Sequence, residues 1–186
     1  MHIAIYTGAS LGLDPAWTDA ARSLAGTLAE AGHTIVYGGG ARGLMGVVAD
    51  AALEAGGRVH GVIPQSLVDA EIGHPGLTEL EVVSGMGPRK DRMAELADAM
   101  VALPGGAGTL EEFFEVWTAQ MLGLHRKPVA LYSPHGFWDA LEELLDGLRD
   151  QGFLGEAARE GLITARTPEG LLARLAAWEP PRPRWG

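Results

Sequence analysis

The chain has 186 residues, 47% of them apolar and 20% charged, which is typical of a globular domain with a sizeable core. Its formal net charge of −10 excludes a general binder of nucleic acid or of anionic membranes, and the lack of cysteine excludes disulfides, a thiolate zinc site and a cysteine nucleophile. No apolar run is long enough to span a bilayer and no basic leader precedes the first apolar segment, so we expect a cytoplasmic protein.

In chain order, short apolar segments alternate with segments of helical spacing. The apolar segments predict six strands, at residues 2–8, 33–40, 58–64, 80–85, 99–106 and 127–132. The amphipathic segments predict helices at residues 14–31, 43–56, 88–97 and 109–123, followed by two or three more up to residue 178. Asp14 and Pro15 are typical of a helix start, Gly56 and Gly57 of a helix end, and Pro168 of the start of the last helix. Residues 65–79 are expected to be irregular.

Strands that alternate with amphipathic helices indicate βαβ units, and right-handed crossovers then place helices on both faces of a mostly parallel sheet. We therefore predict an α/β fold with three αβα layers, in one domain over residues 1–178, with a Pro-rich tail at 179–186. Ligands of such sheets bind beyond the carboxyl ends of the strands. Three predicted strands end in glycine, within "YTGAS", "YGGGARG" and "LPGGAGT", so we expect all three junctions at the ligand edge. Candidate phosphate or ribose contacts there are Ser10, Gly39 and Gly40.

The junction "GGGARG" contains Gly38, Gly40 and Gly43 with the spacing of a dinucleotide-binding fingerprint. Such a site also needs an acidic residue at the end of the next strand to bond the ribose hydroxyls, and "RVHGVIPQS" offers none. The alternative is that these glycines let the helix pack closely on the sheet. A Walker A loop is excluded because no Gly-Lys-Ser/Thr tripeptide occurs.

The junction "PGGAGT" opens a helix and is a better candidate for an anion site. Its glycines let successive N–H groups point at one spot, the first helical turn has unpaired donors, and the helix dipole adds positive potential. Thr109 can add a hydroxyl donor. Two alternatives remain open: a tight turn without a ligand, and a capping box in which Glu112 only satisfies a backbone N–H.

The basic cluster "GMGPRKDR" gives a second indication of an anion. A helix that begins near Pro88 places Arg89, Lys90 and Arg92 in about its first turn, where cations oppose the helix dipole. A bound anion would offset this unfavourable interaction by pairing with the cations. The alternative is that the three side chains point outward into solvent. The histidines show no close metal-ligand spacing, so we expect no metal site.

With these motifs in place, residues 37–64 and 71–132 resemble the LONELY GUY (LOG) family of cytokinin riboside 5′-monophosphate phosphoribohydrolases, many of them earlier described as possible lysine decarboxylases. The resemblance covers nearly the whole chain, and the pairing of Arg-Lys with PGGxGTxxE is highly specific. It implies a Rossmann-like fold, a homodimer, and hydrolysis of a nucleoside 5′-monophosphate to free base and ribose 5-phosphate, without a metal or redox cofactor.

Carried over residue by residue, the resemblance puts the catalytic residues at Arg89 and Glu112. The implied substrate-binding residues are Glu71, Lys90, Gly105, Gly106, Ala107, Gly108, Thr109, Leu110, Glu111 and Thr118. The family commonly reads Met-His-x-Arg-Lys where this chain has "MGPRK", and "EVWTAQML" also departs from the usual pattern, so the preferred base stays open.

Hydrolysis of the N-glycosidic bond needs a carboxylate near the sugar, a hydrogen-bond donor to the substrate and a binding site for the phosphate. We assign the first to Glu112, which would stabilise the cationic sugar and orient or deprotonate water. Arg89 stays charged and would orient the substrate electrostatically, and residues 105–109 would hold the phosphate.

One alternative is a non-catalytic carrier of a nucleotide or a phosphorylated cofactor such as molybdenum cofactor. Another is a pyridoxal-phosphate decarboxylase, for which the chain offers just two lysines, Lys90 and Lys127, neither in a cofactor motif.

Overall fold

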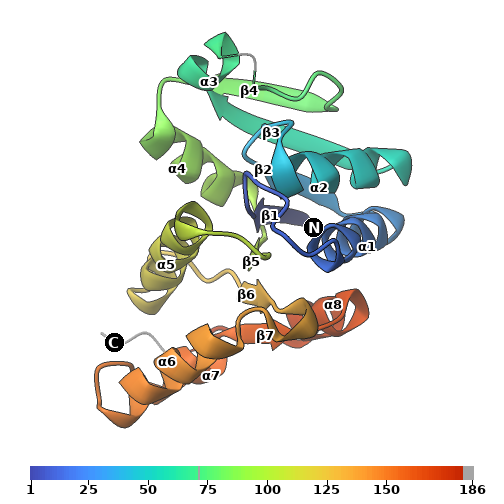
Figure 1. The fold of residues 1–186 in the computed structure, drawn as a ribbon. Coiled ribbons are helices and arrows are strands. Elements are labelled where there is room, and N and C mark those ends of the chain that lie inside the picture. The colour runs from blue at the N-terminus through green and yellow to red at the C-terminus, as the bar shows by residue number, and fades with distance from the viewer. Residues whose placement is uncertain (71, 182–186) are drawn as a thin grey trace.

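The computed structural model describes residues 1–70 and 72–181, and within them the chain forms one seven-stranded parallel sheet (Figure 1). The strand order is β4-β3-β2-β1-β5-β6-β7. The strands are β1 (His2–Tyr6), β2 (Thr34–Tyr37), β3 (Arg58–Pro64), β4 (Glu79–Val83), β5 (Ala99–Ala102), β6 (Val129–Tyr132) and β7 (Ile163–Ala165). All neighbouring pairs are parallel, which confirms the predicted α/β fold.

Helices cover both faces of this sheet (Figure 1). The α-helices are α1 (Ala16–Glu30), α2 (Gly43–Glu54), α3 (Gln65–Asp69), α4 (Met86–Leu96), α5 (Ala107–Met121), α6 (Asp139–Asp150), α7 (Glu156–Gly161) and α8 (Pro168–Ala177), with a short 3-10 helix at Pro134–Gly136. Because side chains alternate along a strand, Ile3 and Ile5 of β1 pack with α1, α2 and α8, whereas Ala4 and Tyr6 pack with α4 and α5. The sheet thus has a separate apolar core on each face.

The chain changes direction across the sheet between β1 and β5. It runs from β1 outward to β4, then returns to β5 on the other side of β1 and continues to β7. In open α/β sheets a ligand crevice lies at such a switch point, beyond the carboxyl ends of the strands. Gly8 follows β1 and Gly105 follows β5, and Gly8 N donates to the carbonyl of Pro104 at 3.2 Å, so the two glycine junctions meet at that point.

Several predicted helix boundaries are confirmed by their capping groups. Asp14 Oδ1 accepts a hydrogen bond from Ala16 N at 2.9 Å at the start of α1, and Thr167 Oγ1 accepts one from Gly170 N at 3.1 Å at the start of α8, whose first residue is Pro168. Gly56 follows α2 with a positive φ of 75°, a conformation that glycine adopts without strain.

Other boundaries differ from the prediction. Helix α3 lies within the segment expected to be irregular, and β7 lies in a segment expected to be helical. Three residues are too few to display a strand period, and β7 forms because it completes the ladder beside β6. Helices α4 and α5 begin earlier than expected, at Met86 and Ala107, because a proline or glycine within the first turn does not interrupt a helix whose first N–H groups have no intrahelical acceptor.

Candidate active site

A cleft of about 510 Å³ opens at the carboxyl ends of β1, β2 and β5. Each of the three glycine-ended junctions contributes to its wall, which confirms that they share one edge of the sheet. The lining residues from these junctions include Gly8, Ser10, Gly38, Gly40 and Gly106. Apolar side chains from α2, α3, α4 and the segment after α3 add to the wall; they are Met45, Leu67, Met86 and Ile72. The cleft therefore has both a polar and an apolar side.

The N-terminus of α5 faces this cleft. Gly106 precedes the helix, and Gly108, Thr109 and Glu111 of its first turns line the cavity. The first N–H groups of a helix have no intrahelical acceptors and carry the positive end of its dipole. This junction is thus a ready anion site.

The capping-box alternative for this junction is wrong. No side chain among the described residues caps α5, and the Glu112 carboxylate turns to Arg89 instead of back to the helix start. Thr109 is 3% exposed and supports the loop: a Cβ on Gly105 would lie 2.1 Å from Thr109 Oγ1. Gly105 itself sits beneath the loop, against the backbone of Gly8.

Arg89 and Glu112 form a buried ion pair at the base of the cleft. Arg89 Nη1 donates to Glu112 Oε1 at 2.7 Å, and Arg89 Nε donates to the carbonyl of Val62 at 3.3 Å. The two residues are 6% and 8% exposed, and both line the cleft. The residues that the family resemblance marked as catalytic are therefore brought together, from α4 and α5.

Gly38 makes room for this pair and was not among the predicted site residues. A Cβ at that position would lie 1.7 Å from Arg89 Nη2, so any larger residue would displace the guanidinium. Its place as the first glycine after a buried strand was visible in the sequence. The neighbour that requires a glycine there comes from α4, which sequence spacing alone could not show.

The Glu112 carboxyl has a raised pKa. Burial disfavours its charged form and is the largest cause; the charge and hydrogen bond of Arg89 act in the opposite direction. A carboxylate whose pKa is raised toward the working pH is better suited to accept a proton than one at its ordinary value.

The basic cluster on α4 splits into three environments. Arg89 enters the cleft, whereas Lys90 Nζ bridges the carboxylates of Glu111 and Glu115, and hydrogen bonds to these two groups raise the pKa of Lys90. Arg92 instead pairs with Glu81 at 2.9 Å on the surface. For Arg92 the outward, solvated alternative is correct.

The remaining predicted residues lie at or near the cleft to different degrees. Ser10 and Gly40 line it. Gly39 has a φ of 73° and packs against β3, where an added Cβ would lie 2.9 Å from Ile63 Cβ, and its carbonyl accepts a hydrogen bond from His74 N in the segment before β4. Ala107 is exposed at the first position of α5 and Leu110 packs against the core. Glu71 lies outside the described residues.

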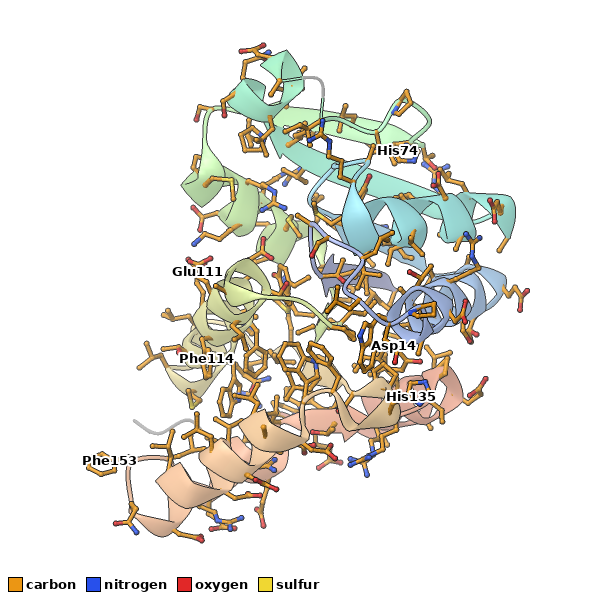
Figure 2. All side chains as sticks on the ribbon, viewed as in Figure 1. Asp14, His74, Glu111, Phe114, His135 and Phe153 are labelled. Carbon is orange, nitrogen blue, oxygen red and sulfur yellow. The ribbon has the colours of Figure 1, made fainter. Side chains whose placement is uncertain are left out.

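Thr118 lines a second cavity, a groove of about 640 Å³ between α4 and α5. Glu111 and Glu112 border both the groove and the cleft, so the two cavities adjoin. Figure 2 shows Glu111 at the end of α5 that lies toward α4 and Phe114 farther along the same helix. The predicted binding residues thus extend along α5 from the cleft into the groove.

Two further findings concern the described residues alone. They contain no cluster of three or more His, Asp or Glu side chains that could hold a metal ion. None of their helices combines the length and apolar character needed to cross a membrane.

Comparisons with known proteins agree with this geometry. Residues 45–175 match a family model described as "Possible lysine decarboxylase". The chain is 44% identical over 179 residues, 96% of its length and 74% of the relative's, to cytokinin riboside 5′-monophosphate phosphoribohydrolase LOG of Oryza sativa subsp. japonica. It is 42% identical over 174 residues, 93% of its length and 88% of the relative's, to cytokinin riboside 5′-monophosphate phosphoribohydrolase of Rhodococcoides fascians.

A solved structure with the same fold is the molybdenum cofactor carrier protein of Chlamydomonas reinhardtii. It superposes with a TM-score of 0.71 at 23% identity, over 95% of this chain and 96% of that one. At that identity the likeness establishes the Rossmann-like fold and nothing about the ligand.

Proposed function

The chain belongs to the LOG family of phosphoribohydrolases, and from that premise we propose that it hydrolyses the N-glycosidic bond of a nucleoside 5′-monophosphate, releasing free base and ribose 5-phosphate. The observation that carries the proposal is the buried Arg89–Glu112 pair in the same cleft as the N-terminus of α5. An anion site and a carboxylate are thus separated by less than two turns of one helix.

The phosphate binds at the first turn of α5 and positions the nucleotide. Backbone N–H groups of residues 107–109 and the helix dipole provide its positive potential. Because the phosphate is remote from the bond that breaks, its binding energy serves to orient the sugar against the catalytic groups.

Glu112 acts at the sugar. Departure of the base builds positive charge on the ribosyl carbon, and a buried carboxylate stabilises that charge more strongly than an exposed one would. The raised pKa of Glu112 also suits it to orient the attacking water and to take its proton.

Arg89 orients the substrate and offsets developing negative charge. Its Nη1 and Nε are held by Glu112 and by the carbonyl of Val62, while its Nη2 lies over Gly38. A guanidinium fixed in this way presents a preorganised donor to the cleft.

A pyridoxal-phosphate decarboxylase is disfavoured by the surroundings of both lysines. Lys90 is paired with two carboxylates, which hold it in the charged, non-nucleophilic form. Lys127 Nζ donates to the backbone carbonyls of Ala94 and Glu95 at 2.8 and 3.2 Å, tying the segment before β6 to the end of α4. A Schiff base needs a free amine directed at the cofactor, and the amines of both lysines are engaged in these contacts.

We also propose that the active protein is a homodimer and that the groove side of α5 is its interface. Large apolar side chains are exposed there: Phe114 at 36%, Leu122 at 49% and Leu124 at 75%. Light scattering coupled to size exclusion tests this proposal: a mass near twice 19.6 kDa supports it, and a monomer at assay concentration contradicts it.

The experiment for the activity is a panel of 5′-monophosphates, with AMP and a prenylated AMP included, analysed by chromatography for free base. We expect base release from at least one nucleotide and little from the matching nucleoside without phosphate. No base release from any member, with nucleotide binding intact, would favour the carrier alternative; equal rates with adenosine and AMP would contradict the role of the α5 N-terminus.

A further inference from the structure

Tyr6, the last residue of β1, has a buried hydroxyl that is hydrogen-bonded by none of the described residues. The residue is 2% exposed, and its ring belongs to the core beneath α4 and α5, together with Phe113 and Trp117. A buried, unpaired hydroxyl destabilises a fold relative to the phenylalanine of the same shape. Packing alone therefore gives no reason for the oxygen atom.

Tyr6 shares a cavity with Glu112. Tyr6 and Glu112 both line the groove between α4 and α5, and Glu112 also lines the cleft, where Arg89 holds it. Burial, and after it the nearby Glu112 charge, raise the pKa of Tyr6. The phenol accordingly keeps its proton at every working pH and is a permanent donor beside a carboxylate.

The other charged groups around the Glu112 carboxylate cannot serve as its second hydrogen-bond donor. Those acting on Glu112 from α4 and from its own helix are Arg89, Lys90 and Glu111, and Glu115 lines the same groove. Lys90 is shared between Glu111 and Glu115, and those two are acceptors. If the Arg89 guanidinium turns to hydrogen-bond a substrate oxygen, Glu112 loses its hydrogen-bond donor. It then needs a second donor to stay ionised and in the same position.

We infer that the Tyr6 hydroxyl donates a hydrogen bond to the Glu112 carboxylate in the nucleotide-bound enzyme, and that Tyr6 is thereby a positioning residue of the reaction. The inference rests on the proposed hydrolysis, since it assigns Arg89 a contact with the substrate. It adds β1 to the two helices that build the site, and it explains why a hydroxyl is kept without a partner in the free enzyme.

The first test is Tyr6→Phe, with Tyr132→Phe as the matched control, a buried tyrosine on β6 whose ring packs on the opposite face of the sheet. We expect Tyr6→Phe to lower kcat by about 10- to 100-fold, the rate equivalent of a hydrogen bond to a charged group, with KM changed less than about twofold. Its melting temperature should equal or exceed that of wild type, since the unpaired hydroxyl is gone.

The pH profile separates positioning from packing. A lost donor raises the pKa of Glu112 in the complex, so the acid limb of kcat should move to higher pH in Tyr6→Phe and stay in place in Tyr132→Phe. In a Glu112→Gln background, Tyr6→Phe should have no further effect on the residual rate. An unchanged kcat and acid limb in Tyr6→Phe would overturn the inference while leaving the proposed hydrolysis intact.

A binding measurement makes the inference testable without turnover. Calorimetric titration with ribose 5-phosphate, in buffers of different ionisation enthalpy, reports the protons taken up on binding. We expect Tyr6→Phe to take up more protons than wild type, by up to about one per site, because Glu112 then protonates when Arg89 turns to the ligand. Equal proton uptake by the two proteins would overturn the role of Tyr6. The hydrolysis is tested separately: a wild type that binds AMP but releases no free base would overturn it.

Discussion

The junctions after β2 and after β5 are both rich in glycine, but they differ in how much space surrounds those glycines. After β2, the space where a side chain would be is already filled: a Cβ on Gly38 would strike the Arg89 guanidinium, and one on Gly43 would lie 2.2 Å from the backbone of Ala9. After β5, Gly105 is also packed, against Thr109. A Cβ added to Gly106 or to Gly108, however, would have no described atom within 4 Å apart from the adjacent chain and the backbone of its own helix.

The difference shows which glycines serve packing and which leave room for a ligand. The first junction holds the proposed catalytic pair and a neighbouring loop in place by close approach, whereas the second keeps a helix N-terminus open to the cleft. Glycine spacing alone does not distinguish the two uses, and the first junction even has the spacing of a dinucleotide site. The predictions below test this division, beginning with the pair that both junctions support.

Glu112→Gln should cause the largest loss. We expect base release from AMP to fall by at least about 100-fold, the low end of positioned acid–base effects, because the amide can neither take a proton nor balance the sugar's positive charge. Steady-state assays on the purified variant measure it, with circular dichroism to verify the fold. Glu95→Gln, an exposed carboxyl paired with Arg92, is the matched control and should retain full activity. A fully active Glu112→Gln would remove the carboxylate from the mechanism.

Gly38→Ala tests the packed junction. The added methyl overlaps the position of Arg89 Nη2, so the guanidinium must move away from Glu112. We expect kcat/KM to fall by about 10- to 100-fold, as when a catalytic group is misplaced, and the free energy of unfolding to fall by about 1–3 kcal/mol. Urea denaturation and kinetics measure the two effects. A variant with wild-type values in both would mean that the close approach is of no consequence.

The pH dependence follows from the raised pKa of Glu112. Because burial raises that pKa above the ordinary 4.5, the ionised carboxylate is present above the raised value and is lost as the pH falls through it. The acid limb of the kcat/KM profile, which reports the free enzyme, should therefore lie above pH 4.5, and below the limb kcat/KM should fall about tenfold per pH unit. An acid limb below pH 4.5 would contradict the assignment of Glu112 as the group that must be ionised.

Gly106→Ala tests the open junction and should behave in the opposite way to Gly38→Ala. Its φ of −103° is accessible to alanine, and the new methyl would meet no described atom beyond the neighbouring residues of the chain, so the unfolding free energy should change by less than about 0.5 kcal/mol. The methyl narrows the space for the phosphate, and we expect KM for AMP to rise by about 3- to 10-fold, a cost of about 1 kcal/mol. A large loss of stability with unchanged KM would reverse the comparison between the junctions.

Arg92→Ala should have the smallest effect. Arg92 lies near Arg89 on α4, yet its partners are the surface carboxylates of Glu81 and Glu95, and exposed ion pairs contribute little. We expect activity within about twofold of wild type and an unchanged melting temperature. A loss as large as that of Glu112→Gln would place the site on the outer face of α4.

Much of the fold could be predicted from the sequence, because hydrophobic period and capping residues are local signals. The glycines that follow strands, the cap Asp14 and the helix-starting Pro168 act within a few residues of themselves. Strand β7 could not be predicted, since three residues show no period and their order depends on pairing with β6. The sequence predicts later starts for α4 and α5 than the structure shows, because "GMGP" and "GGAG" have the composition of loops. These residues can nevertheless form a first helical turn, since the N–H groups there need no intrahelical acceptor.

The site was less accessible to local reasoning. The local spacing at Thr109 is compatible with both an anion site and a capping box. The assignment of Arg89 and Glu112 as catalytic residues depends on the family resemblance. Gly38 and Tyr6 were not found, because their importance depends on which side chain of α4 or α5 arrives beside them. That information is in the tertiary packing of both faces of the sheet.

The most direct measurement is a crystal structure of the Glu112→Gln variant with bound AMP. We predict the phosphate at the backbone N–H groups of residues 107–109, the ribosyl carbon beside the residue-112 side chain, and the Arg89 guanidinium in contact with the nucleotide. A nucleotide bound outside the cleft, or one whose sugar lies away from residue 112, would contradict the account.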